Sequence, residues 1–243
     1  MPSVIHKIDR FADTIIILKN PCKSFAPWED KLTNYKDLES SIEHTRDNRS
    51  VQHGRKNREN REAEPAGLPS EPTESEDEEI HYLVSSSHLI LASPWFRRVL
   101  TTKAFTESWK DSTDGRYHIQ ASDWDAEALL ILLSIFHLRT RQVPRAVSLE
   151  MLAKLAVLVD YYELENAEVM ERDVKEWITN LRRSVAIPPS YCRDLMLWIC
   201  VSQVFRMQEE FTRATAVAIK TSKGLIQTLD LPIQQKVICT LAP

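Results

Sequence analysis

The sequence predicts an α+β fold followed by an all-helical C-terminal extension. Short β-branched runs of strand length alternate with short helical segments in the first half of the chain. Longer segments with apolar residues at helical spacing fill the second half. The 243 residues are enough for one domain of ordinary size and an appended segment. We therefore expect one interrupted α+β domain over residues 1–181 and a helical extension over residues 182–243.

The first predicted strand is the β-branched run at residues 14–18, whose continuous apolar character indicates burial on both faces. From about residue 21 to residue 77 the composition changes. Aliphatic residues are few, and a net basic stretch at residues 46–61 precedes several prolines and an acidic run. Such a composition does not bury enough apolar surface to balance the entropy lost on ordering. We therefore expect a disordered, charged insertion here.

The next predicted elements are a strand at residues 80–84 and a pair of short helices. The serines at residues 85–87 are expected to cap a helix at residues 88–92. Pro94 opens the second helix, because the first turn of a helix does not need the N–H that proline lacks. A turn at residues 114–115 then leads into a third short strand at residues 116–119.

Helices dominate the rest of the chain. Ser122 and Asp123 are candidate caps for a helix at residues 126–136, which is apolar almost all round and is therefore expected at the centre of the core. Ser148 is the expected cap of the helix that follows. Beyond the cap at Ser148, helices are predicted at residues 149–162, 167–181, 194–205 and 209–221, with a short one opened by Pro232.

One continuous stretch, residues 79–100, carries a specific pattern. In it His88 precedes an aliphatic-Leu-Ala step, which is followed by a Ser, aromatic, Phe step. This stretch resembles the strand and helix pair of the BTB/POZ family. Asp13 followed by Ile15 and Ile17 is similar to the family's opening strand, and residues 155–164 resemble its late helix, with an alanine-rich face, a tyrosine and a closing leucine.

The resemblance covers roughly residues 11–178 apart from the insertion, and residues 202–219 resemble the helical tail of fungal-type BTB proteins. It implies a small sheet with a helical cluster that serves protein–protein interaction, without enzymatic activity or a cofactor. Two hypotheses follow. The chain is either an adaptor that recruits substrates to a cullin ubiquitin ligase, or a self-associating or transcription-related scaffold that does not bind a cullin.

Two features depart from the family pattern. Dimeric BTB proteins begin with an extra helix that exchanges between subunits, whereas few residues precede the first predicted strand here. We therefore expect no domain-swapped dimer, and the oligomeric state stays open. The insertion separates strands that the family joins tightly. This is tolerable, because the free-energy cost of closing a loop rises by only about 0.6 kcal/mol for each doubling of its length.

The candidate partner-binding residues are Phe105, Thr106 and Glu107, just after the second predicted short helix. Cullin-binding BTB proteins resemble one another in a hydrophobic-x-Glu triplet at this place, in which the apolar side chain fills a groove and the carboxylate fixes orientation. The alternative is that Phe105 packs against its own domain and Glu107 is a solvated charge. Three aromatic residues of the extension either pack onto the core or line a partner groove: Trp198, Phe205 and Phe211.

No catalytic, cofactor or metal site is predicted. The four glycines are not clustered, so the sequence has neither a P-loop nor a dinucleotide fingerprint. His88 lies beside three serines but lacks a nucleophile elbow, and local helix capping is the preferred interpretation. His81 and His88 occur without paired cysteines or an HExxH pattern, which argues against a metal site.

Composition and charge narrow the partners and the compartment. The net charge of −4 gives no overall bias toward nucleic acid. Within residues 46–61, interleaved acids and missing aromatic residues favour a solvated linker over a nucleic-acid contact or a nuclear import signal. The longest apolar run is too short to span a bilayer. The four cysteines form no CxxC pair and no secretory signal is visible, so we expect the cytoplasm or nucleus.

Overall fold

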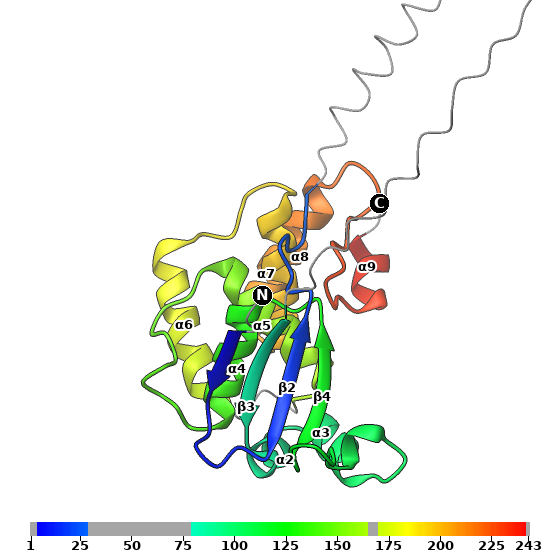
Figure 1. Cartoon of the computed structure of the whole chain (residues 1–243). Coiled ribbons are helices and arrows are strands. Elements are labelled where there is room, and N and C mark those ends of the chain that lie inside the picture. The colour runs from blue at the N-terminus through cyan, green and yellow to red at the C-terminus, as the bar shows by residue number, and fades with distance from the viewer. Residues whose placement is uncertain (1–3, 29–78, 165–169, 242–243) are drawn as a thin grey trace, which may run out of the picture. The chain divides into compact units, whose positions relative to one another are not determined.

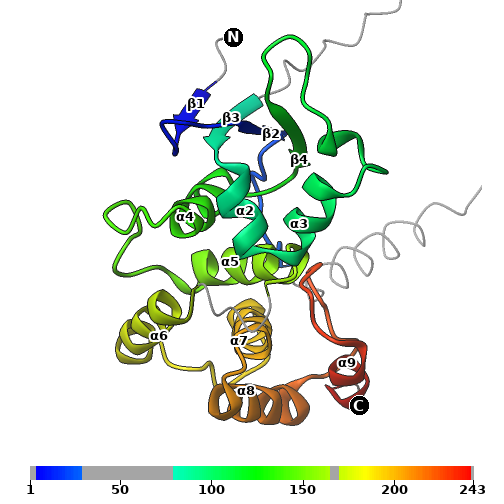
Figure 2. The same ribbon diagram turned by 90° about the horizontal axis from the view of Figure 1, so that it is seen from below.

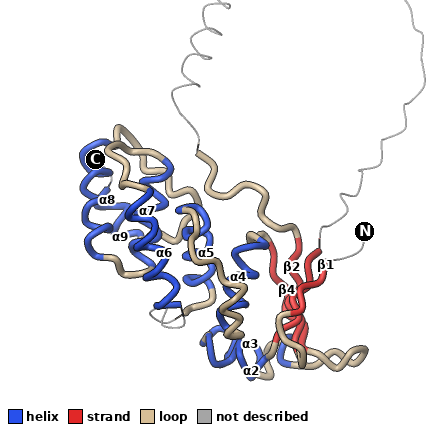
Figure 3. The backbone as a smooth tube through the Cα atoms, turned by 90° about the vertical axis from the view of Figure 1, so that its left-hand side faces the viewer, coloured by secondary structure: helices blue, strands red, loops and turns tan. Residues whose placement is uncertain are grey.

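The computed structural model describes residues 4–28, 79–164 and 170–241, and most of the predicted insertion lies outside these ranges. The fold is α+β, as the sequence predicted: helices pack against one face of a four-stranded sheet (Figures 1 and 3). The strands are β1 (Val4–Lys7), β2 (Thr14–Lys19), β3 (Glu79–Val84) and β4 (Tyr117–Ser122).

The sheet has the strand order β1-β3-β2-β4, so β3 and β2 lie at its centre. The β2 strand is antiparallel to β3 and parallel to β4, and β1 is parallel to β3. In this register Ile16 of β2 lies beside Tyr82 of β3 and Ile119 of β4, and each of the three is at most 1% exposed. Residues 14–18 are all buried, which confirms the prediction of a strand enclosed on both faces.

The β1 strand was not predicted. Its four residues include Val4 and Ile5, both exposed, and its partner β3 lies far along the chain beyond the insertion. So short a run has no periodicity of its own. Its strand conformation is set by pairing with β3, which local sequence does not reveal.

Residues 21–27, which the sequence assigned to the insertion, belong to the same compact unit as the sheet and the helices. The Cys22 N–H donates to the carbonyl of Trp124 at 3.0 Å. The guanidinium of Arg193 donates to the carbonyls of Phe25 and Ala26, both at 2.8 Å. The folded part of the chain therefore extends past the predicted boundary at residue 21.

Two short helices, α2 (Ser86–Ala92) and α3 (Pro94–Thr101), follow β3. The N-terminus of α2 is capped from 73 positions away: the Asp13 carboxylate accepts from the Ser86 N–H at 2.7 Å and from its hydroxyl at 2.6 Å. Although burial acts to raise it, the pKa of Asp13 is held below its ordinary value by these bonds. Ser85 makes no side-chain capping bond, so the predicted serine cap is wrong. Pro94 opens α3 as predicted.

The middle of the core is built by α4 (Ala126–Phe136) and α5 (Leu149–Tyr161). Figure 2 shows α4 on the sheet side of α5, and the central position predicted for α4 is confirmed by its largely buried surface. Its cap is Asp125, which accepts from the N–H of Ala128 at 2.9 Å, and not the predicted Ser122 or Asp123. Ser148 caps α5 as predicted.

The C-terminal part contains α6 (Glu171–Ser184), α7 (Arg193–Val204), α8 (Gln208–Thr221) and α9 (Gln235–Leu241). Helix α7 packs between α5 and α8 (Figure 2), and its Trp198 is almost wholly buried. The predicted domain boundary at residue 181 falls inside α6, and the described residues on both sides of it belong to one compact unit. Among the described residues, no helix combines the length and apolar character needed to cross a membrane.

Candidate partner-binding surface

The three candidate residues lie on the loop that connects α3 to β4. Its middle is one turn of 3-10 helix, η1 (Thr106–Ser108). The Phe105 N–H donates to the carbonyl of Thr102 at 3.0 Å, and the Phe105 carbonyl accepts from the hydroxyl of Ser108 at 2.7 Å. The Trp109 N–H donates to the carbonyl of Thr106 at 3.1 Å. These bonds fix the backbone on both sides of Phe105.

Two aromatic side chains project from this loop toward solvent. Phe105 is 42% exposed and Trp109 is 61% exposed. The half-buried Glu107 accepts from the hydroxyl of Thr106 at 3.0 Å, and the indole N–H of Trp109 donates to the carbonyl of Lys103 at 3.4 Å. Exposed apolar groups gathered in one place are typical of interaction sites. Phe105 and Trp109 are accordingly accessible to a partner.

The C-terminal half of the loop is a braced turn. The turn predicted at residues 114–115 is present, and Gly115 adopts the left-handed conformation there, with φ of +69°. The Asp114 carboxylate lies 3.0 Å from Nε2 of His118 and accepts from the N–H of Arg116 at 2.9 Å. These two hydrogen bonds hold the pKa of Asp114 below its ordinary value. A loop ordered in this way loses little conformational entropy when a partner binds.

Sequence reasoning identified Phe105 but missed Trp109. The available signal was a second large aromatic residue four positions later, in a segment that is otherwise mostly polar. Its exposure could not be foreseen, because a tryptophan in such a segment packs inward about as readily as it projects outward.

A cluster of Asp9, His88 and His137 offers three ligand atoms within 4.8 Å of one another. Both ring nitrogens of His137 are already engaged, since Nε2 accepts from the Ser85 N–H at 2.9 Å and Nδ1 donates to the carbonyl of Leu133 at 2.8 Å. Burial lowers the pKa of His137, and the ring of His88 stacks on it with centroids 4.7 Å apart. A metal ion would have to displace the Ser85 hydrogen bond, so the cluster is better suited to joining α2 to α4.

The structure thus brings Phe105, Thr106 and Glu107 together on one exposed loop. Of the aromatic residues in the extension, Trp198 is in the core, whereas Phe205 lines a groove beside α6. No model of a known protein family matches the chain, and no curated protein matches it either. What the chain does has to be inferred from its own residues.

Proposed function

We propose that the chain is a non-enzymatic protein-interaction module of the BTB/POZ type, which binds a protein partner through the loop between α3 and β4. The observation that carries the proposal is the exposure of Phe105 and Trp109 on a loop whose backbone is fixed by its own hydrogen bonds. Aromatic side chains on a rigid support are typical interface anchors, because they bury a large area at a low cost in entropy.

The order of the elements supports the family part of the proposal. From β2 to α6 the chain forms two strands, two short helices, a third strand and then helices, which is the order that the sequence predicted and in which the resemblance was found. Two residues of the resembling pattern also have structural roles. Asp13 caps α2, and His88 stacks on His137, which caps the C-terminal end of the central helix α4.

The specific partner that we propose is the amino-terminal domain of a cullin, with the chain acting as a substrate adaptor for a ubiquitin ligase. In such a complex Phe105 enters an apolar groove of the cullin, and the carboxylate of Glu107 fixes the orientation of the loop. Any chemistry then belongs to the ligase. The compartment we propose is the cytoplasm or nucleus, which suits four cysteines that are all free thiols.

One observation favours the second candidate, a self-associating scaffold. The β1 strand lies at the edge of the sheet and presents the exposed Val4 and Ile5. An unprotected edge strand is a template for pairing with another chain. In this alternative the edge of the sheet, and not the Phe105 loop, makes the main contact.

Binding to a purified cullin amino-terminal domain separates the two candidates. Wild-type chain is expected to bind, and Phe105→Ala is expected to weaken binding about thirtyfold or more, because an aromatic anchor contributes upward of about 2 kcal/mol. Leu225→Ala, which removes an exposed apolar side chain in the loop between α8 and α9, is the control and should bind like wild type. Undiminished binding by Phe105→Ala contradicts the anchor. No binding by wild type favours the scaffold, and sedimentation equilibrium then reports self-association.

A further inference from the structure

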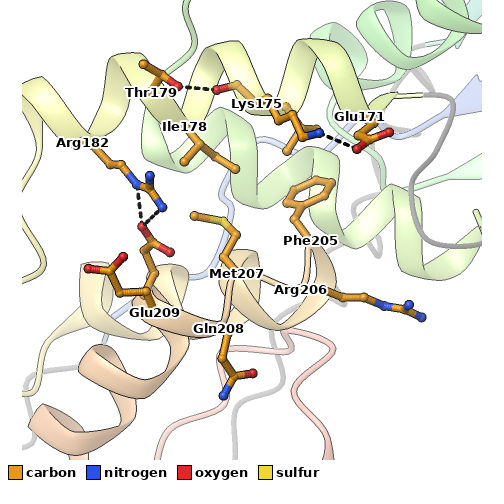
Figure 4. A pocket seen from close by; sticks show the side chains of 12 residues that line it. Glu171, Lys175, Ile178, Thr179, Arg182, Phe205, Arg206, Met207, Gln208 and Glu209 are labelled. Atoms are coloured by element: carbon orange, nitrogen blue, oxygen red, sulfur yellow. Dashed lines mark hydrogen bonds and ion pairs between the residues drawn. The ribbon is translucent and has the colours of Figure 1, made fainter.

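A groove of about 750 Å³ lies between α6 and the corner where α7 turns into α8. The floor of this α6–α8 groove is apolar. Figure 4 shows the side chains of Ile178, Phe205 and Met207 pointing toward one another across it. Ile178 and Met207 are buried, and Phe205 is half-buried. The groove is lined by α6, by residues 205–207 at the corner after α7 and by the start of α8, and it does not involve the loop between α3 and β4.

One end of the groove holds a buried carboxylate of which only one oxygen has a hydrogen-bond partner among the described residues. Glu210 on α8 is 4% exposed, and its Oε1 pairs with the guanidinium of Arg182 on α6. Its Oε2 is buried and has no hydrogen-bond partner among the described residues. Buried polar atoms in folded proteins nearly always have a partner, and a carboxylate oxygen accepts only from a donor. This atom therefore indicates a missing donor at that end of the groove.

The charges around the groove are uneven. At one end Lys175 is paired with Glu171 at 2.5 Å. Arg206 points away from the apolar floor (Figure 4). At the other end the exposed Glu209 precedes Glu210 and has no ion-pair partner within the ranges that the structure describes. The end that carries the unpaired oxygen is accordingly anionic, next to an apolar floor.

We propose that the α6–α8 groove binds a segment of a partner protein in which a lysine or arginine adjoins apolar side chains. The cationic group donates to Oε2 of Glu210, while the apolar side chains cover Ile178, Phe205 and Met207. A cation complements the anionic end, whereas an acidic segment is repelled by Glu209 and an uncharged apolar segment leaves Oε2 without a donor. This inference is independent of the Phe105 loop, and either can fail without the other.

The ligand class is tested with two small probes that differ in one group, hexylammonium and hexan-1-ol. Both are titrated into the full chain carrying ¹³C-methyl-labelled methionine. The Met207 methyl signal, assigned with Met207→Leu, is expected to shift saturably with hexylammonium, at least about tenfold more tightly than with hexan-1-ol. The methyl of Met196, in the core, should not respond. Equal affinities for hexylammonium and hexan-1-ol, or no shift of the Met207 signal, overturn the proposal. Equal affinities are the result expected if a water molecule, and not a ligand, donates to Oε2.

The peptide part is tested by fluorescence anisotropy with a helical peptide of leucines and one lysine, and with the same peptide carrying glutamine in place of lysine. The lysine peptide is expected to bind at least about tenfold more tightly to wild type. Glu210→Gln should abolish that difference. Glu209 is exposed, so Glu209→Gln tests the anionic end if Glu210→Gln fails to fold. This variant should lower the affinity for the lysine peptide and leave the affinity for the glutamine peptide unchanged. Arg206→Ala is the control and should leave both affinities unchanged. Equal binding of the two peptides to wild type contradicts the proposal.

Discussion

Replacing Asp13 with alanine is expected to lower the free energy of unfolding by about 2–4 kcal/mol. Asp13 accepts two hydrogen bonds, from the N–H and the hydroxyl of Ser86, and Ser86 is buried. Hydrogen bonds to a charged group contribute about 1.5–3 kcal/mol each, and the lower part of that range applies because the carboxylate is partly exposed. The loss also removes the cap of α2, which leaves two buried donors without a partner.

Thermal and urea unfolding of Asp13→Ala measure this loss. For a chain of this size the midpoint temperature should fall by about 5–15 °C. Asp13→Asn keeps one acceptor oxygen and is expected to lose less. Since the pKa of Asp13 is lowered from 3.8, its contribution is present above pH 3.8 and is lost as the pH falls through the folded-state pKa. A loss under about 0.5 kcal/mol, the usual size for a surface substitution, would refute the capping role.

Three further predictions concern buried groups. Ser93→Ala should cost about 2–3 kcal/mol in urea unfolding, because the buried Ser93 hydroxyl donates to the carbonyl of Tyr162 at 2.6 Å; an unchanged midpoint would contradict this. Burial lowers the pKa of His137 from 6.5, so unfolding experiments should show stability falling as the pH drops below 6.5. His137→Gln should flatten that fall, and an equally steep fall in the variant would exclude His137 as the cause. Burial raises the pKa of the Cys200 thiol to about 12. A disulfide reagent at mildly alkaline pH should therefore label the exposed Cys239 but reach Cys200 only after unfolding. Labelling of Cys200 in the native chain would show that the core opens there.

The sequence predicted those elements whose determinants are adjacent residues. The β-branched run at residues 14–18 became the buried strand β2, because burial on both faces requires apolar side chains in succession. Pro94 and Ser148 marked the starts of α3 and α5, because proline and serine favour the first turn and the cap of a helix through contacts within the same turn.

The features that were missed depend on residues far apart in the chain. The β1 strand exists through its parallel pairing with β3. Likewise, α2 is capped by Asp13 from 73 positions away, although three serines stand at its start. A local cap and a distant cap satisfy the same N–H group, and only the path of the chain decides between them.

The two candidate sites differ in the same respect, since one is formed by adjacent residues and the other by residues far apart in the chain. Phe105 to Glu107 could be proposed from the sequence, because a short loop motif keeps its residues together whatever the rest of the chain does. The α6–α8 groove could not, because Glu210 is charged and reads as a surface residue in the sequence. It is buried only when α8 packs beside α6, where Arg182, 28 positions earlier, reaches its carboxylate.

The claim that Phe105 anchors a protein partner is tested most directly by quantitative affinity capture from the cells that make the chain. Wild type, Phe105→Ala and the control Leu225→Ala are compared, after thermal unfolding has shown equal stability. If Phe105 is the anchor, a set of partners is recovered at least about tenfold less with Phe105→Ala and is retained by Leu225→Ala. Equal recovery of every partner with Phe105→Ala would contradict the claim.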